Sequence, residues 1–195
     1  MIKVDIVEML ERKLRPVTDE QQANTAVAIL LKINNQNFMI LFVRRAKNLA
    51  DPWSGQIGFP GGKHELGDEN LKQTIIRETK EEAGINLLKD CRFLGVLDAQ
   101  RTKPKPDLKI LPFVVLLQDE PLIKLNLKEL RTFFWISIGQ LAENRTIVEL
   151  ASEKQPAYVF GKKVIWGLTC RILEDLFQTL KLQQTTGTHQ NQDFS

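Results

Sequence analysis

One stretch near the middle of the chain joins a double glycine to a run of acidic residues, and it limits the fold more than any other segment. The dipeptide 61–62 is typical of a tight turn, and residues 70–83 carry apolar side chains at helical spacing. On a helix of about 3.6 residues per turn, Glu78, Glu81 and Glu82 share one face. Crowded carboxylates repel one another, so the pattern predicts a neutralising cation, and oxygen ligands suit Mg²⁺, Mn²⁺ or Ca²⁺.

The segment 62–85 resembles the Nudix box, G-x5-E-x7-R-E-U-x-E-E-x-G-U, in which U is a large apolar residue. The matching positions are Gly62, Arg77, Glu78, Glu81, Glu82, Gly84 and Ile85. Two positions depart from the box. Asp68 stands at the first acidic position, with one extra residue before Arg77 and with Glu69 beside it as an alternative, and Thr79 fills an apolar position. An amphipathic helix with a solvated acidic face is the other interpretation, but it does not explain the double glycine.

The resemblance implies an α/β fold, a Nudix α/β/α sandwich with a central mixed sheet. The box helix would cover one face, and the C-terminal helix would contribute to the other. It also implies metal-dependent cleavage of a diphosphate linked to another moiety, with Mg²⁺ or Mn²⁺ held by Glu78, Glu81, Glu82 and the carbonyl of Gly62. Arg77 belongs to the same catalytic group, and its spacing of four residues from Glu81 favours ion pairing that orients the glutamates. One of these acids, or an acid from a later loop, would deprotonate the attacking water.

The residues ahead of the box indicate a substrate class. Residues 55–62 read Gly-Gln-Ile-Gly-Phe-Pro-Gly-Gly, which is similar to the coenzyme A diphosphatase branch of the family, as are residues 165–169. This resemblance implies coenzyme A or a related compound as substrate. Ala46 and residues 51–53 depart from that branch, so an ADP-ribose or dinucleoside polyphosphate diphosphatase is an alternative. A non-catalytic nucleotide sensor is a third possibility, although such domains typically lack box glutamates that this chain keeps.

The candidate substrate-binding residues are Arg44, Arg45, Trp53, Gln56 and Lys63. Arg44 and Arg45 close a predicted strand, where one of them would hold a phosphate or both would be solvated. Trp53 would stack on a base or anchor its loop. The basic, proline-containing loop 100–107 would bind an anionic part of the substrate or simply connect two strands. Glu129 is either an additional ligand or base, or a surface glutamate.

Bulk properties set the remaining limits. The 195 residues predict a single domain over 1–182, followed by a polar, disordered tail over 183–195. The net charge of +3 is too small to indicate nucleic-acid binding, and no apolar run approaches the ~18 residues that a membrane span needs. Cys91 and Cys170 fit neither a zinc site nor a disulfide framework, and acids near the N-terminus do not match a secretory signal, so we expect a cytoplasmic protein. The expected partner is a small nucleotide, with a homodimer left open.

Periodicity and turn residues place the other elements. Helices are expected over 4–14, through 140–141 and over 168–182, and strands over 24–33, 38–43, 93–99, 108–117 and 133–136, with a final hairpin over 158–165. The strands over 24–33 and 38–43 are apolar almost throughout, so we expect the sheet to be covered on both faces.

Overall fold

The computed structural model describes residues 3–35, 37–89, 91–150 and 152–182, so the predicted tail over 183–195 lies outside the described residues. The helices are α1 (Lys3–Lys13), α2 (Leu71–Ala83), α3 (Ile138–Glu143) and α4 (Gly167–Leu180). The strands are β1 (Thr25–Asn34), β2 (Asn37–Arg45), β3 (Ile57–Gly58), β4 (Gly61–Lys63), β5 (Cys91–Val96), β6 (Gln100–Arg101), β7 (Lys109–Leu117), β8 (Leu130–Ser137), β9 (Arg145–Leu150), β10 (Glu153–Phe160) and β11 (Lys163–Trp166).

The central sheet is mixed, as predicted. Its strands run in the order β3-β2-β1-β7-β5, and β4, β6 and β8 pair with β1, β7 and β2. β1 and β2 form an antiparallel hairpin, whereas β1 and β7 run parallel, with Ile29 opposite Val114. β4 returns antiparallel to β1, with Gly62 opposite Ala26. The double glycine is therefore a short strand of the sheet, next to β1.

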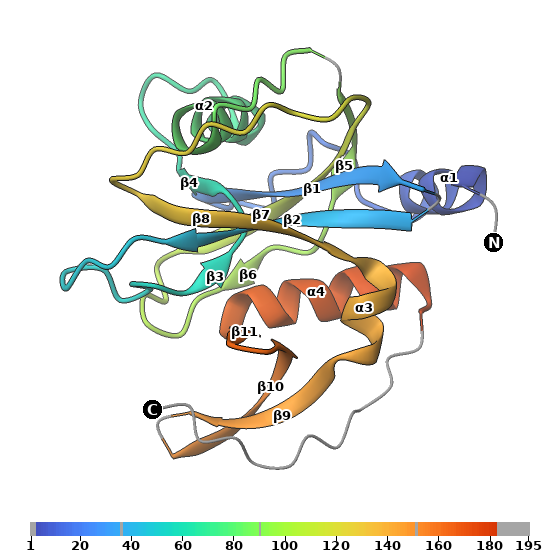
Figure 1. Cartoon of the computed structure of the whole chain (residues 1–195). Helices are drawn as coiled ribbons and strands as arrows, with labels where there is room; N and C mark the ends of the chain where they lie inside the picture. Colours follow the sequence, from blue (N-terminus) through green and yellow to red (C-terminus); the bar gives the residue numbers. More distant parts are fainter. Residues whose placement is uncertain (1–2, 36, 90, 151, 183–195) are drawn as a thin grey trace.

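Both faces of the sheet are covered, which explains the nearly unbroken apolar runs in its strands (Figure 1). Along β1, Ala28 and Leu30 pack in the core on the α2 side, and Ile29 and Leu31 pack in the core on the α4 side. This alternation follows from the two-residue period of a strand. The expected sandwich, with the box helix on one face and the C-terminal helix on the other, is confirmed.

Helix α2 is closed at both ends by residues that suit those positions. The side chain of Asn70 accepts a hydrogen bond from the backbone N–H of Gln73, at 3.0 Å. Gly84 follows the helix in the left-handed conformation, at φ 71°, and its N–H bonds back into the last turn. Thr79 is buried at its apolar position, and its hydroxyl donates to the carbonyl of Ile75 at 2.8 Å. The second departure from the box is thus accommodated inside the helix.

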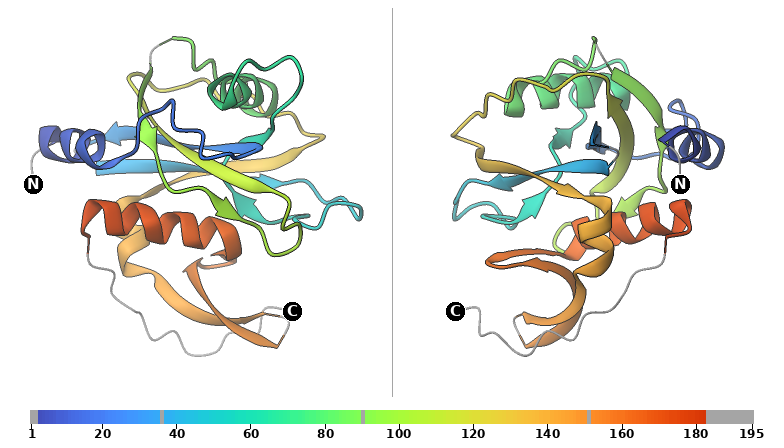
Figure 2. Two further views of the ribbon diagram at one scale, coloured as in Figure 1. Left: turned by 180° about the vertical axis from the view of Figure 1, so that it is seen from behind. Right: turned by 45° about the vertical axis from the view of Figure 1, so that its right-hand side comes forward.

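A second, three-stranded antiparallel sheet of β9, β10 and β11 lies beyond α4 from the central sheet (Figure 2). The predicted hairpin over 158–165 supplies β10 and β11. Tyr158 of β10 stacks on Phe177 of α4, with ring centroids 6.2 Å apart. Strand β9 was not predicted. Within the described part of the chain, no helix has the length and apolar content that crossing a membrane requires.

Candidate active site: a glutamate cluster at the edge of a cavity

The double glycine lies against the glutamates of α2, and each glycine is required for a different reason. The N–H of Gly61 donates to Oε2 of Glu82 at 2.9 Å. Gly61 has φ +148°, and a Cβ there would lie 2.2 Å from the carbonyl oxygen of Ala26. A Cβ on Gly62 would instead lie 2.2 Å from Oε1 of Glu78. The first glycine permits the strand pairing, and the second leaves room for a carboxylate.

The three box glutamates lie in different environments. Glu82 is buried, at 3% exposure, whereas the side chains of Glu78 and Glu81 are 13% and 55% exposed. Burial raises the pKa of Glu82 to about 8; the Gly61 N–H opposes this shift and the charge of Glu78 adds to it. Burial also raises the pKa of Glu78, and Arg77 opposes that shift. Two carboxylates that resist ionisation side by side make a site that favours an added positive charge.

Arg77 connects the loop before α2 to the glutamates. Its Nε and Nη2 donate to the two carboxylate oxygens of Asp68, both at 3.0 Å, and its Nη1 reaches Glu78 at 2.9 Å and Glu81 at 3.1 Å. These hydrogen bonds hold the pKa of Asp68 well below its usual range. Asp68 thus forms the bidentate pair with Arg77, whereas Glu69 is exposed. Through these contacts Arg77 joins Asp68 to Glu78 and Glu81.

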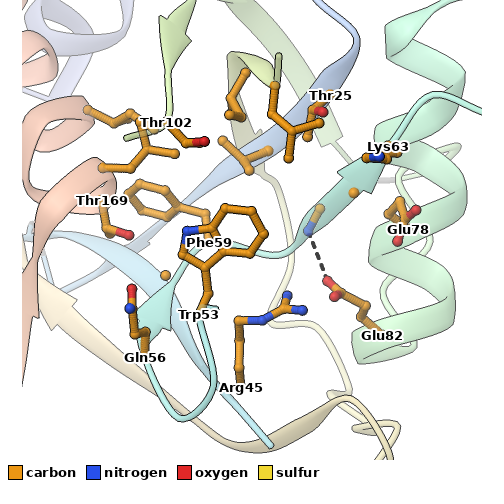
Figure 3. A pocket seen from close by; sticks show the side chains of 18 of the residues that line it. Thr25, Arg45, Trp53, Gln56, Phe59, Lys63, Glu78, Glu82, Thr102 and Thr169 are labelled. Carbon is orange, nitrogen blue, oxygen red and sulfur yellow. Dashed lines mark hydrogen bonds between the residues drawn. The ribbon is translucent and has the colours of Figure 1, made fainter. Parts of the chain in front are cut away.

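A cavity of about 350 Å³ opens beside the cluster (Figure 3). Glu78, Glu82, Gly61 and Gly62 line it together with four of the five predicted substrate-binding residues, which are Arg45, Trp53, Gln56 and Lys63. Figure 3 shows the glutamates and Lys63 at one side of the view, Gln56 and Thr169 at the other, and Trp53 and Arg45 between them. The cavity therefore has an acidic end and an end built by loops and by α4.

Of the two neighbouring arginines, Arg45 lines the cavity and Arg44 is not among its described lining residues. Adjacent residues of a strand point to opposite faces, so only one of them can face the cavity. The guanidinium of Arg44 donates to the carbonyl of Gly55 at 3.2 Å. Arg45 donates to Asp51 at 2.8 Å, and its charge also lowers the pKa of Glu82, against the effect of burial.

The segment before β8 brings a further carboxylate to the cavity. Glu129 is a lining residue, and its Oε1 accepts from the side-chain amide of Asn126 at 2.7 Å. The backbone N–H of Asn126 donates to the carbonyl of Glu82 at 2.8 Å. One asparagine therefore connects Glu129 to the end of the box helix, which a reading of the sequence alone did not reveal.

The two sequence segments that resemble the coenzyme A diphosphatase branch meet at the cavity. Thr169 of α4 donates through its hydroxyl to the carbonyl of Ile57 at 3.2 Å, and both residues line the cavity. Phe59, Leu168 and Ile172 give this end an apolar wall. Ile172 lies within the helix expected over 168–182, and its apolar character gives no sign that it lines a site.

The donor set suits a hard divalent cation. Glu78, Glu82 and the carbonyl of Gly62 offer only oxygen atoms, and the missing side chain of Gly62 leaves the space that the Glu78 carboxylate fills. Among the described residues, no three acidic, histidine or cysteine side chains already converge as a metal cluster. Arg77, paired with Glu78 and Glu81, also supplies positive charge to these acids.

Comparison with known proteins agrees with this architecture. Residues 22–156 match the family model described as the NUDIX domain. The peroxisomal coenzyme A diphosphatase ndx-8 of Caenorhabditis elegans is 32% identical over 142 residues, which cover 72% of this chain and 59% of that protein. The mitochondrial coenzyme A diphosphatase NUDT8 of Mus musculus is 31% identical over 154 residues, covering 73% of this chain and 70% of that protein. Among solved structures, the NUDIX domain of Shewanella oneidensis NrtR, complexed with ADP ribose, superposes with a TM-score of 0.54 at 15% identity over 92% of this chain and 99% of that chain.

Proposed function

The chain belongs to the Nudix family, and from this premise we propose that it hydrolyses the diphosphate linkage of a nucleoside diphosphate derivative, with coenzyme A as the first candidate. One observation carries the proposal. The Gly61 N–H and the bare Cα of Gly62 hold Glu82 and Glu78 at the edge of a cavity of about 350 Å³. A diphosphate reacts slowly until its negative charge is neutralised, and this is the part of the molecule that an oxygen-rich metal site recognises.

The residues of the cluster have separate tasks in this proposal. Glu78 and Glu82, with the Gly62 carbonyl, would hold Mg²⁺ or Mn²⁺, and Glu81 would contribute from the exposed side. A bound divalent cation would neutralise phosphate charge and lower the pKa of a water molecule. Arg77 holds Glu78 and Glu81 in place through its ion pairs, and Asp68 fixes the guanidinium in turn. Arg45 and Lys63 offer the positive charge that attracts the substrate phosphates.

Proton removal from the attacking water is assigned to an acid that lines the cavity. Glu78, Glu82 and Glu129 all qualify by position. Burial raises the pKa of Glu82 to about 8, which places its titration near neutral pH. A cation bound by Glu78 and Glu82 would lower the affinity of both carboxylates for a proton, and Glu129 would then be the group left to accept it.

Coenzyme A is the first candidate substrate for two reasons. The worm and mouse relatives are named coenzyme A diphosphatases. The segments 55–62 and 165–169, which resemble that branch, are in contact at the cavity through Thr169. The chain spans about three fifths of the length of the worm protein, so the activity of the relatives is proposed for this chain rather than transferred to it.

A product-resolved panel tests the proposal. The purified protein is incubated with Mg²⁺ or Mn²⁺ and coenzyme A, ADP-ribose, NADH, diadenosine polyphosphates or nucleoside triphosphates, and the products are identified by mass. We expect 4′-phosphopantetheine and adenosine 3′,5′-bisphosphate from coenzyme A, and no product after addition of EDTA. If AMP from ADP-ribose is the main product, ADP-ribose replaces coenzyme A as the proposed substrate, and the proposed diphosphate hydrolysis stands. No turnover of any compound, with nucleotide binding retained, would favour a sensor instead.

We propose one domain over 1–182, a small nucleotide as partner and no nucleic-acid partner, with the oligomeric state to be measured by light scattering. A cytoplasmic location remains a proposal, and the two relatives are named for the peroxisome and the mitochondrion. Cell fractionation decides among these compartments.

A further inference from the structure

Two loops that are distant in sequence meet at the wall of the cavity. Trp53 comes from the loop between β2 and β3, and Lys105 from the loop between β6 and β7. The Nζ of Lys105 lies over the indole ring, 5.4 Å from its centroid, and both residues line the cavity. An aromatic face and an ammonium group therefore stand together outside the glutamate cluster, in the same cavity.

Trp53 is carried by a braced turn. Its backbone N–H donates to Oδ1 of Asp51 at 3.0 Å, and its carbonyl accepts from the N–H of Gln56 at 3.1 Å. Asp51 is itself held by Arg45 at 2.8 Å, and its side chain is only 13% exposed. Because hydrogen bonds hold the backbone on both sides of Trp53 and Arg45 holds Asp51, the indole can present a defined face to a ligand at low entropic cost.

Lys105 has a fixed backbone and an exposed side chain. The buried Thr102 donates through its hydroxyl to the carbonyl of Lys105 at 2.7 Å and accepts from its N–H at 3.2 Å. Arg171 of α4 donates to the carbonyl of Arg101, the last residue of β6, at 2.7 Å, just before this loop begins. The backbone of Lys105 is thus held in place, while its four-carbon side chain can carry the ammonium group to a phosphate and contact it as a point charge.

The charged residues that line the cavity lie in different places, so they suit different parts of a substrate. Among the described residues that line it, the cations are Arg45, Lys63 and Lys105, and the acids are Glu78, Glu82 and Glu129. Lys63 belongs to β4, beside the glutamates, and Arg45 is paired with Asp51. Lys105 is the cation that lies over an aromatic ring, on a loop separate from the box.

We propose that Trp53 and Lys105 bind the nucleoside end of the substrate, with the indole stacking on the base and the ammonium group binding a phosphate carried by the ribose. This inference rests on the proposed function, because it places the scissile diphosphate at the glutamates. A base has an aromatic face of the kind that stacks on indole, and a dianionic phosphate attracts the ammonium more strongly than the ring does. The preferred class is then nucleotides with a phosphorylated ribose, such as coenzyme A, over those without, such as dephospho-coenzyme A.

The first test compares the kcat/KM values for coenzyme A and dephospho-coenzyme A. Lys105→Met keeps the aliphatic stem and removes the charge, and it should lower the ratio of the two values roughly tenfold, the scale of one exposed charged hydrogen bond. Lys105→Arg should retain the ratio. Lys103→Met is the matched control, because Lys103 is an exposed cation of the same loop that is not among the described lining residues. An unchanged ratio in Lys105→Met overturns the inference and leaves the proposed function standing.

The second test measures binding without turnover. Isothermal titration with adenosine 3′,5′-bisphosphate and with 5′-AMP should show weaker binding of the bisphosphate alone in Lys105→Met, and weaker binding of both nucleotides in Trp53→Leu. Equal loss for the two nucleotides in Lys105→Met would overturn the assignment of the ribose phosphate. If Lys105→Met weakens only the binding of the bisphosphate, and the wild-type protein cleaves neither coenzyme A nor dephospho-coenzyme A, the inference survives and the proposed function fails.

Discussion

Replacing each glycine of the pair 61–62 by alanine should separate activity from stability. In Gly62→Ala the new Cβ would lie 2.2 Å from Oε1 and 2.4 Å from Cδ of Glu78, whereas ordinary contact begins at 3.4 Å. The carboxylate is the far end of a flexible side chain, so it can retreat by about 1 Å at little cost to the fold. A displacement of about 1 Å at a reacting centre lowers turnover about a hundredfold.

Gly61→Ala is the matched variant with the opposite expectation. Its Cβ would lie 2.2 Å from the carbonyl oxygen of Ala26 and 2.7 Å from the Cα of Val27, which are backbone atoms of β1, and φ +148° is unfavourable for alanine. Strained backbone and an overpacked core each cost about 1–3 kcal/mol. At about 2–4 °C per kcal/mol for a chain of this size, the melting temperature should fall by several degrees or more.

The assay pairs a thermal melt with the initial rate of hydrolysis of the best substrate from the panel. Gly62→Ala should melt within about 2 °C of the wild-type protein and lose about 99% of its rate. Gly61→Ala should show the larger drop in melting temperature. The reasoning is refuted if Gly62→Ala keeps its full rate, or if the two variants are destabilised to the same extent.

Three further predictions follow from the same cluster. In metal-free buffer, folding stability should decrease as pH rises from about 4.5 to about 8, because folded Glu82 retains a proton that the unfolded chain has lost. The slope of stability against pH from this one group is at most ~1.4 kcal/mol per pH unit. Urea unfolding of Glu82→Gln at several pH values should show a smaller slope than the wild-type protein. Equal slopes for the two proteins would show that Glu82 does not titrate as described. Asp68→Asn should lower the free energy of unfolding by about 1–3 kcal/mol, because it weakens the bidentate contact with Arg77. Glu69→Gln, at the exposed neighbouring position, should lower it by less than about 0.5 kcal/mol. Similar losses would mean that both acids support Arg77. Mn²⁺ at about 100 times its dissociation constant should stabilise the wild-type protein by about 2.7 kcal/mol, and Glu82→Gln should show a smaller gain at the same concentration; an equal gain would exclude Glu82 as a ligand.

The box and the layers of the fold were predictable because they depend on local signals. Helix α2 has a capping residue before it, glycine after it and an apolar stripe along it, and the runs in β1 and β2 are too apolar for a sheet with one solvated face. Strand β9 was missed because its side chains do not alternate in polarity. Thr146 is buried and Ile147 is exposed, so the two-residue period of burial over residues 145–150 has no counterpart in the sequence.

The residue-level details of the cavity were beyond the reach of the sequence. The pair Arg44 and Arg45 must split between two faces, but the register of β2 decides which one faces the cavity. The choice between Asp68 and Glu69 depends on the path of the loop before α2, which brings Asp68 to the guanidinium. Trp53 and Lys105 stand on two loops that are distant in the sequence, so no local pattern indicates their contact.

The separate bracing of the two cavity loops bears on how such a protein can diverge. The loop with Trp53 is held by Arg45 and Asp51, and the loop with Lys105 is held by Thr102 and Arg171, whereas the cleavage chemistry is assigned to α2 and β4. Sequence drift or directed evolution can therefore exchange the loop with Lys105 without changing a residue that contacts the glutamates of α2. The loop with Trp53 tolerates such exchange where Asp51 is kept, because Asp51 holds Arg45, whose charge acts on Glu82. A library randomised over residues 52–55 and 103–107 would sample new substrates on the same hydrolytic scaffold.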